Sequence, residues 1–198
     1  CILRYCRIWS VEAGLPQISV TAIAQDAQGF IWLGTQNGLA RFDGLNFKVY
    51  NTANTPALPS NLISALHIDA QQRLWVGTVN GLARLAQHEF SRLDQQQDAL
   101  GAVSSFAELA DGTVLIGAMR LFRWHEQLQY LQPVVEHHGQ VFQLHQQHDT
   151  VWIGALNGFA TLNADGYQWH PAPEQVSALQ ISEIAVQGAS VYLGSNVG

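Results

Sequence analysis

Ile31-Trp32-Leu33-Gly34 is the first of five related tetrapeptides, each with apolar or aromatic residues before a glycine. The other four are Leu74-Trp75-Val76-Gly77, Val114-Leu115-Ile116-Gly117, Val151-Trp152-Ile153-Gly154 and Val191-Tyr192-Leu193-Gly194. The intervals between successive glycines are 43, 40, 37 and 40 residues, with a mean of 40. Self-similarity at such a period indicates a repeat architecture, in which each repeat is one supersecondary unit.

Each repeat divides into four short strands separated by turn residues. The strands predicted in the first repeat are Val20–Asp26, Phe30–Thr35, Leu39–Asp43 and Asn46–Asn51. Those predicted in the second repeat are Ile63–Asp69, Leu74–Thr78, Leu82–Ala86 and Glu89–Asp94. Asn-Gly and Asp-Gly pairs between the strands are expected to supply the positive φ values that tight hairpins need. No stretch of ten residues or more shows a helical period.

The second strand of each repeat is apolar at consecutive positions rather than at alternate ones. A strand with water on one face would alternate, so both faces of these sheets are expected to be covered. Four-stranded antiparallel units of about forty residues, covered on both faces, are typical of a β-propeller. The sequence therefore predicts an all-β fold in which neighbouring blades pack face to face around a central channel.

The repeats predict a β-propeller fragment of about four and a half four-stranded antiparallel blades. Its blades are predicted at residues 20–51, 63–94, 103–133 and 141–171, with a partial fifth at 181–198. Residues 1–19 are interpreted as a ragged N-terminus that includes an outer strand, Arg7–Val11, of a closing blade. The remaining blades, of undetermined number, are expected beyond Gly198. This chain alone is then expected to form an open arc with exposed blade faces.

Composition excludes some classes of function. Only 12% of the residues are charged, 47% are hydrophobic and the net charge is −6, so no phosphate-neutralising nucleic-acid surface is expected. No run of 18 apolar residues occurs, so membrane attachment is expected only through segments outside the chain. The two cysteines, Cys1 and Cys6, are interpreted as incidental thiols in preference to a disulfide or the end of a removed signal peptide.

The recurring tryptophans and glycines have a structural interpretation. Each tryptophan is predicted to fill the gap against the next sheet, in preference to stacking on a sugar or a cofactor, because it recurs with the repeat. The structural residues of the repeat are Trp32, Gly34, Trp75, Gly77, Gly117, Trp152, Gly154 and Gly194.

Candidate metal-binding and catalytic groups have simpler interpretations. One aspartate lies at the first hairpin of each of three repeats: Asp26, Asp69 and Asp111. Each is predicted to accept backbone N–H groups within its turn, because a metal would need several converging oxygen ligands. The one local histidine cluster is His137, His138, His145 and His148. These are predicted to be surface or loop residues, since neither a helical i, i+4 pair nor a cysteine supports zinc. No nucleophile elbow or P-loop occurs, so no catalytic residue, metal or cofactor is assigned.

Ligand binding is predicted on the face where the loops that precede each first strand meet the second hairpins of the blades. Neutral amides and hydroxyls in these loops suit a small, uncharged, polar ligand such as a glycan. For the three asparagines that precede glycine, a role in the turn is favoured over ligand contact. The candidate ligand-binding residues are Gln17, Ser19, Gln36, Asn37, Ser60, Asn61, Asn80 and Asn157.

The first two repeats resemble the two-component regulator propeller repeat. The motifs that carry this resemblance are Gly14-Leu15-Pro16-Gln17, Ile31-Trp32-Leu33-Gly34-Thr35 and Asn37-Gly38-Leu39-Ala40-Arg41-Phe42, with Leu58-Pro59-Ser60-Asn61 and Asn80-Gly81-Leu82-Ala83-Arg84-Leu85 in the second repeat. The resemblance weakens later, where Leu115 replaces the tryptophan and Gly158-Phe159 replaces Gly-Leu.

The resemblance implies the periplasmic, extracytoplasmic ligand-binding sensor of a bacterial membrane receptor. In such receptors a homodimer would pass the binding signal through a membrane helix to a histidine kinase or diguanylate cyclase, all outside this chain. The fold alone does not imply this function. Two alternatives stay open: a propeller enzyme of the lyase or lactonase type, and a protein-interaction platform.

Overall fold

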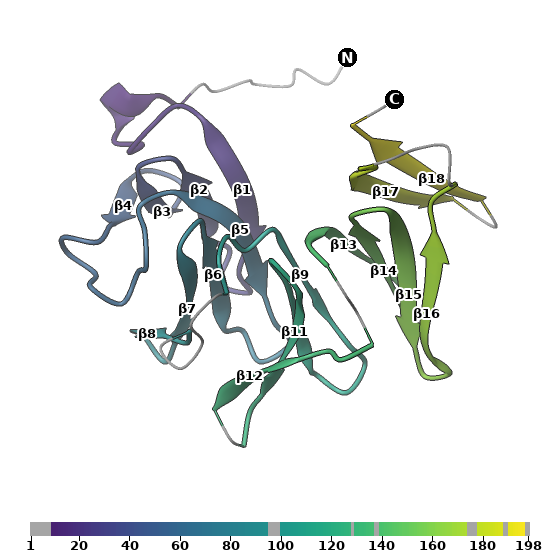
Figure 1. The fold of residues 1–198 in the computed structure, drawn as a ribbon. Helices are drawn as coiled ribbons and strands as arrows, with labels where there is room; N and C mark the ends of the chain where they lie inside the picture. The colour runs from purple at the N-terminus through teal and green to yellow at the C-terminus, as the bar shows by residue number, and fades with distance from the viewer. Residues whose placement is uncertain are drawn as a thin grey trace, which may run out of the picture.

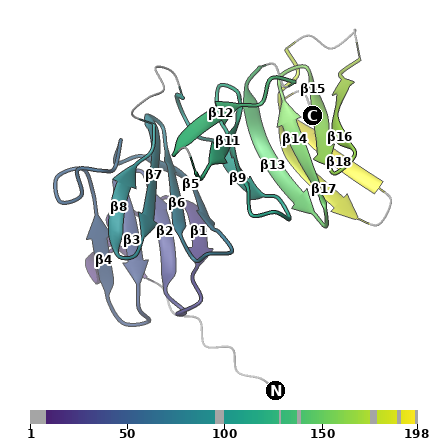
Figure 2. The same ribbon diagram turned by 90° about the horizontal axis from the view of Figure 1, so that it is seen from below.

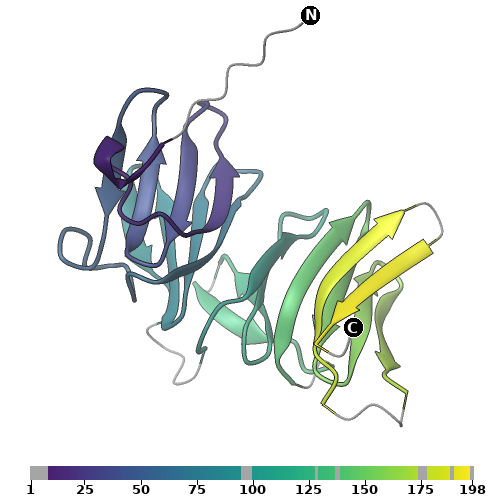
Figure 3. The ribbon, with the colours of Figure 1, turned by 90° about the horizontal axis from the view of Figure 1, so that it is seen from above.

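The computed structural model describes residues 9–94, 100–127, 129–136, 139–173, 178–187 and 190–196. This part of the chain is all-β and forms four four-stranded antiparallel sheets and one two-stranded sheet. The sheets follow one another in chain order along an arc, from the purple sheet near the N-terminus to the yellow pair near the C-terminus (Figure 1, Figure 3). The predicted propeller fold is confirmed.

Strand boundaries follow the turn residues. The first sheet contains β1 (Val20–Gln25), β2 (Ile31–Thr35), β3 (Gly38–Phe42) and β4 (Phe47–Tyr50). The second contains β5 (Ile63–Ile68), β6 (Leu74–Thr78), β7 (Gly81–Ala86) and β8 (Glu89–Arg92). The third contains β9 (Ser105–Glu108), β10 (Val114–Gly117), β11 (Leu121–His125) and β12 (Tyr130–Pro133). The fourth contains β13 (Val141–Gln147), β14 (Thr150–Ala155), β15 (Gly158–Asn163) and β16 (Gly166–Pro171), and the fifth contains β17 (Ile181–Gln187) and β18 (Ser190–Ser195).

Each four-stranded sheet is an up-and-down meander, and we call each sheet a blade, numbered 1 to 5 in chain order. The first strands of consecutive blades contact one another, and Figure 2 shows β5, β9 and β13 in succession. Blades 1, 2, 4 and 5 share a register shift after the first residue of the first strand. The residue left unpaired by such a shift is free to point its side chain at a neighbour.

Hydroxyl groups at two of these unpaired positions, and at the residue just before β9, join the blades. Thr21 Oγ1 donates to the carbonyl of Ile63 at 2.6 Å, and Ser64 Oγ donates to that of Val103 at 2.6 Å. Ser104 Oγ donates to the carbonyl of Val141 at 2.8 Å. Blade 4 has Phe142 in the corresponding place. The hydroxyl after an apolar residue at the start of a repeat is therefore an inter-blade contact that the sequence analysis missed.

The hydrophobic core is divided among the blade boundaries. One buried cluster joins blades 1 and 2 around Trp32 and Val76, and a second joins blades 2 and 3 around Trp75 and Ile116. A third joins blades 3 and 4 around Leu115. Successive residues of one second strand thus face opposite neighbours, which explains why these strands are apolar at every position.

The repeated glycine allows the blades to approach closely. A Cβ built on Gly77 would lie 2.6 Å from Cγ1 of Val103, and one on Gly34 would lie 2.7 Å from Cγ2 of Ile63. On Gly154 it would lie 2.3 Å from the carbonyl oxygen of Ile181. Separations this short do not occur for real side chains, so the sequence repeats glycine where the next blade begins.

The N-terminal segment differs from the prediction. Of the predicted outer strand Arg7–Val11, the first two residues lie outside the described part of the chain, as do Cys1 and Cys6. Trp9 and Ser10 are not in a strand, and Val11 begins a 3-10 turn, η1 (Val11–Ala13), that Gly14 ends at φ 103°. Trp9 packs on Phe42 with ring centroids 4.5 Å apart, so side-chain packing rather than strand pairing attaches this segment. No helix within the described residues is long and apolar enough to cross a membrane.

Candidate functional site

The predicted ligand-binding face is built from hairpins and lead-in loops that hydrogen-bond to one another. The Gly38 N–H, in the second hairpin of blade 1, donates to the carbonyl of Asn61 in the loop leading into blade 2 at 2.7 Å. The Asn157 N–H in blade 4 donates to the carbonyl of Leu179, which leads into blade 5, at 2.6 Å. Each lead-in loop is therefore attached to the preceding blade.

The eight candidate residues fall into three places on this face. Four come together at the boundary of blades 1 and 2: Gln36, Asn37, Ser60 and Asn61. Asn80 is in the second hairpin of blade 2, next to Val79, whose N–H donates to the carbonyl of Leu62 in the same lead-in loop. Gln17 and Ser19 precede β1, and Asn157 lies at the distant boundary of blades 4 and 5.

Several of these side chains already have partners within the protein. Asn61 Oδ1 accepts the Thr52 N–H at 2.8 Å, and Ser60 Oγ accepts the Leu62 N–H at 3.1 Å. The Ser19 N–H donates to Gln17 Oε1. These residues shape their loops, whereas the side chains of the four other candidates are exposed: Gln36, Asn37, Asn80 and Asn157.

The hairpins behind these asparagines are of two kinds. Thr35 Oγ1 accepts the Asn37 N–H at 3.1 Å and donates to the Gly38 carbonyl at 2.8 Å, and Thr78 does the same in blade 2. In both hairpins the positive φ that the Asn-Gly pair was expected to supply is at the glycine and not at the asparagine. In blade 4, where Ala155 cannot make these bonds, Asn157 has φ 62°. The threonine hydroxyl therefore distinguishes the two kinds of hairpin.

The aspartates of the first hairpins have a second role that the sequence analysis missed. Asp26 accepts the N–H groups of Gln28 and Phe30, both at 3.0 Å, as a turn former would. Its Oδ2 also accepts the indole N–H of Trp32 at 2.9 Å. Asp69 repeats this bond with Trp75 at 2.7 Å. The recurrence of Asp and Trp six residues apart is the signal that could have revealed it.

Asp111 is not the equivalent of these two aspartates. It accepts the Thr113 N–H at 2.9 Å, but the backbone bonds that Asp26 and Asp69 make in their turns are made by Leu109 in blade 3. Blade 3 also has Leu115 in place of the tryptophan. The carboxylate and the indole are thus absent together from this blade, whereas blade 4 keeps Trp152 with Gln146 six residues before it.

The two histidines of the predicted cluster that the structure describes are not part of a metal-ligand group. His137 and His138 lie outside the described residues. His145 lies on β13 opposite Trp152, and His148 is exposed in the following turn at φ 52°. Within the part of the chain that the structure describes, no three His, Cys, Asp or Glu side chains are grouped as metal ligands.

A charged cluster lies at the boundary of blades 2 and 3, at the end of the blades opposite to the predicted face. Glu126 Oε2 is 2.8 Å from Arg73 Nη1 and 3.2 Å from Arg84 Nη1, and it accepts the indole N–H of Trp124 at 2.6 Å. Burial opposes ionisation of Glu126, but these hydrogen bonds and ion pairs outweigh it, so its pKa lies below the ordinary value. Arg84 lies over the rings of Trp75 and Trp124 at 5.4 and 5.3 Å.

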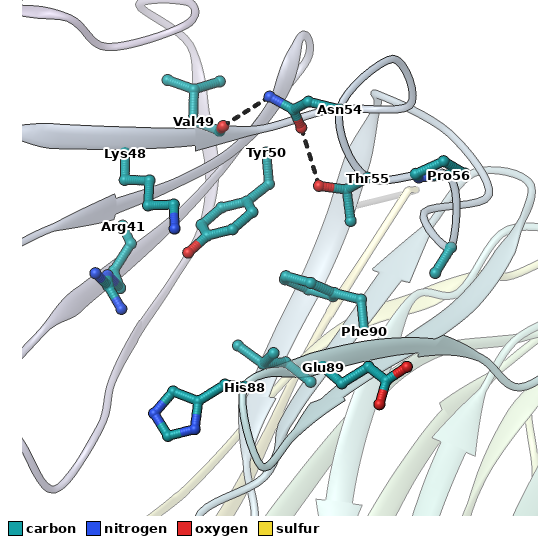
Figure 4. Close-up of a pocket in the computed structure, with 12 residues that line it drawn as sticks. Arg41, Lys48, Val49, Tyr50, Asn54, Thr55, Pro56, His88, Glu89 and Phe90 are labelled. Carbon is teal, nitrogen blue, oxygen red and sulfur yellow. Dashed lines mark hydrogen bonds between the residues drawn. The ribbon is translucent and has the colours of Figure 1, made fainter.

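A hollow of about 540 Å³ opens at the outer rim between blades 1 and 2 (Figure 4). Its aromatic wall is formed by Tyr50 of β4 and Phe90 of β8, with ring centroids 5.1 Å apart. Its charged and polar lining comprises Arg41, Lys48, Asn54, Thr55, His88 and Glu89. Asn54 fixes the loop above the rings, because its amide donates to the Val49 carbonyl at 3.1 Å. None of the eight candidate residues lines this hollow.

Comparisons with known proteins give the repeat a family. The model of the family "Two component regulator propeller" matches residues 14–37 and 57–80. "Histidine kinase P4" of Formosa agariphila is 54% identical over 37 residues, which are 19% of this chain and 3% of that protein. The family motif therefore accounts for the first two repeats.

Solved structures share the fold. The extracellular domain of BT4673 from B. thetaiotaomicron, described as a one component system, matches with a TM-score of 0.72 and 23% identity, over 89% of this chain and 26% of that one. Virginiamycin B lyase from Staphylococcus aureus matches with a TM-score of 0.64 and 14% identity, over 81% of this chain and 58% of that one. The chain thus spans about a quarter of the BT4673 extracellular domain, and these similarities support the fold alone.

Proposed function

We propose that this chain, which carries two-component regulator propeller repeats in a propeller fold, is part of the extracytoplasmic ligand-binding region of a bacterial signal-transduction receptor. The observation that carries the proposal is the family match at residues 14–37 and 57–80. The short match to a histidine kinase supports it. The chain itself binds and transmits; a kinase or diguanylate cyclase output and the membrane helix belong to other parts of the receptor.

The proposed ligand is small, polar and uncharged, with a glycan as the leading candidate. Gln36, Asn37 and Asn80 present exposed amides near one lead-in loop, and amides both donate to and accept from hydroxyl groups. Because the Asn61 carbonyl accepts the Gly38 N–H, a ligand that moves this loop also moves blade 2 relative to blade 1. Transmission through a receptor homodimer then requires only that the ligand bind one arrangement of the blades better than another.

The test begins with membrane topology and ends with ligand binding. Alkaline phosphatase fused within the full-length receptor after residue 198 is expected to be active, since the enzyme requires export. Thermal-shift screening of neutral oligosaccharides on the full-length protein is then expected to identify a ligand whose shift is lost in Gln36→Ala with Asn80→Ala. An inactive fusion would contradict the extracytoplasmic location. A ligand whose shift survives both substitutions would contradict the loop-face site.

A propeller lyase is the second candidate function, and one pair of side chains favours it. His67 on β5 and Glu108 on β9 approach to 3.5 Å across neighbouring first strands. Burial lowers the pKa of His67 despite the nearby Glu108, so the imidazole is available as a neutral base. Turnover of a lactone or cyclic ester that His67→Asn abolishes would favour this function over the sensor.

A further inference from the structure

Arg41 and Lys48 form an unusual pair on the outer strands of blade 1. They are directly opposite each other in the β3–β4 ladder. Like charges at directly opposed positions destabilise an antiparallel pair. Among the described residues neither side chain has a carboxylate within ion-pair distance. Their contacts are with rings instead: Arg41 lies 4.3 Å from the centroid of Phe30, and the Lys48 amine lies 5.2 Å from that of Tyr50.

The next blade boundary shows how the same arrangement is neutralised within the protein. Arg84 is opposite Trp75 in blade 2, as Arg41 is opposite Trp32 in blade 1. Arg84, however, faces the neutral Ser91 on its outer side, and Glu126 of blade 3 forms its ion pair.

At the boundary of blades 1 and 2, the residue at the position that corresponds to Glu126 has an uncharged amide side chain. Glu126 directly follows β11, the third strand of blade 3, and Gln87 directly follows β7, the third strand of blade 2. Each boundary therefore has two basic side chains, but only the boundary of blades 2 and 3 has a carboxylate that forms ion pairs with both of them.

These two cations line the rim hollow described above. In Figure 4 the Lys48 amine, the Tyr50 hydroxyl and the Arg41 guanidinium gather at one end, whereas Glu89 lies at the other end and points away from them. A second hollow of about 270 Å³ shares Arg41 and His88 with the first, and it is also lined by Asp26, whose carboxylate accepts the Trp32 indole N–H. A cavity of about 540 Å³ is within the size range of small-molecule sites.

We propose that this hollow binds a small carboxylate that carries a ring, and that the ligand supplies the negative charge which Glu126 supplies at the next boundary. The carboxylate accepts from Lys48 and Arg41, and one face of the ring packs on Tyr50 and Phe90. A sugar acid and an aromatic acid share this chemistry. The site is separate from the loop face and takes an anion rather than a neutral ligand.

The first experiment measures binding of glucuronate, benzoate and neutral glucose to the full-length protein by ligand-detected NMR titration. At least one carboxylate is expected to bind, and glucose is expected to bind far more weakly. Lys48→Gln is expected to weaken binding of the carboxylate by about tenfold, because a charge-assisted hydrogen bond is lost. Arg120→Gln is the matched control, since it removes an exposed cation outside the hollow and is expected to change nothing.

Two further measurements do not depend on the Lys48 variant. Lys48 is the only lysine among the 198 residues, so ligand protection of its amine from acetylation can be assigned by mass spectrometry. Gln87→Glu places a carboxylate in the chain where Glu126 has its counterpart. This substitution is expected to raise the melting temperature. It is also expected to weaken binding of the added carboxylate ligand by about tenfold, because the new glutamate side chain competes with the ligand for Arg41.

Preference for glucuronate identifies a sugar acid and preference for benzoate an aromatic acid, and either supports the site. Equal binding of glucose, no carboxylate binding at millimolar concentration, or binding that Lys48→Gln and Gln87→Glu both leave intact would overturn it. The inference does not rest on the sensor proposal. Failure of the carboxylate-binding experiments therefore leaves the topology and loop-face results unchanged. Failure of the topology or loop-face tests leaves the carboxylate result unchanged.

Discussion

A single carboxylate organises the first hairpin of a blade. Asp69 is almost fully buried, accepts the indole N–H of Trp75 at 2.7 Å and also contacts the Arg73 guanidinium at 2.5 Å. Asp26 makes the bond to Trp32 but has no arginine beside it among the described residues. The same residue type at the same position of the repeat therefore contributes differently to stability in the two blades.

Asp69→Ala is expected to destabilise the propeller more than Asp26→Ala. Removal of Asp69 leaves the buried indole N–H of Trp75 without its acceptor and leaves the Arg73 guanidinium with Glu126 as its one carboxylate partner, which costs about 3 kcal/mol. Removal of Asp26 breaks no ion pair and leaves the Trp32 indole and two turn N–H groups, which are less buried, so it costs about 1–2 kcal/mol. Thermal unfolding of the intact protein, followed by tryptophan fluorescence, measures both. Equal losses would show that the arginine contributes nothing.

Protonation of a single side chain, the imidazole of His67, makes the stability of the protein depend on pH. Its folded pKa is below the unfolded value of 6.5, because burial outweighs the attraction of Glu108 and Asp69. The unfolded chain thus binds a proton more readily than the folded one, so stability falls as pH falls below about 6.5. The neutral variant His67→Gln is expected to flatten this part of the curve of melting temperature against pH. His148→Asn, at an exposed turn, is the control and should leave the slope unchanged.

At the scale of the elements, the repeated glycines determine how closely neighbouring blades approach. In blades 1 to 4 the second strand has a glycine at or next to its last residue, and an apolar residue at the start of the next repeat packs against it, as Val103 packs on Gly77. The Ser64 hydroxyl donates to the carbonyl of that same valine. A close approach and a hydrogen bond thus hold blade 3 at one position relative to blade 2.

Gly77→Ala is expected to cost about 1–3 kcal/mol, because the added methyl group would overlap Cγ1 of Val103. The cost should be smaller when Gly77→Ala is made in the Val103→Ala background, which removes the overlapping atom. A double-mutant cycle from the four melting curves isolates this coupling. Additive losses would mean that the glycine is needed for a reason other than close approach.

At the scale of the whole molecule, the two ends of the arc differ from its interior. Ile23 of β1 is 66% exposed, whereas Leu144 and Ile184, at the same register in β13 and β17, are 7% and 4% exposed. Tyr192 occupies the tryptophan position of blade 5 and is 59% exposed, against 0% for Trp75. The faces that interior blades bury are open in blades 1 and 5.

The 198-residue chain purified by itself is therefore expected to bind a hydrophobic dye and to self-associate, since apolar blade faces meet water. Dye fluorescence and sedimentation velocity provide the measurements. Ile23→Lys with Tyr192→Lys should reduce both effects, and an exposed pair in hairpins, Leu45→Lys with Met119→Lys, is the matched control. A dye-free monomer would contradict the expectation.

The sequence alone was enough to predict the all-β propeller, because strand patterning, turn residues and the forty-residue period are local properties of the chain. It also identified Asp26 and Asp69 as turn formers. It did not reveal their bonds to tryptophan, and it placed Asp111 with them because counting aspartates along the chain cannot distinguish a turn position from its neighbour two residues away.

Contacts between blades were decided by tertiary structure. Arg84 meets Glu126, 42 residues away, because strand register and hairpin length place the two on facing edges. The same register places Arg41 and Lys48 together without a carboxylate at the neighbouring boundary. The period of the repeat predicted the strand and the face on which each residue lies. Which charged side chains meet depends on how two blades stack, and packing at glycines such as Gly77 determines that stacking.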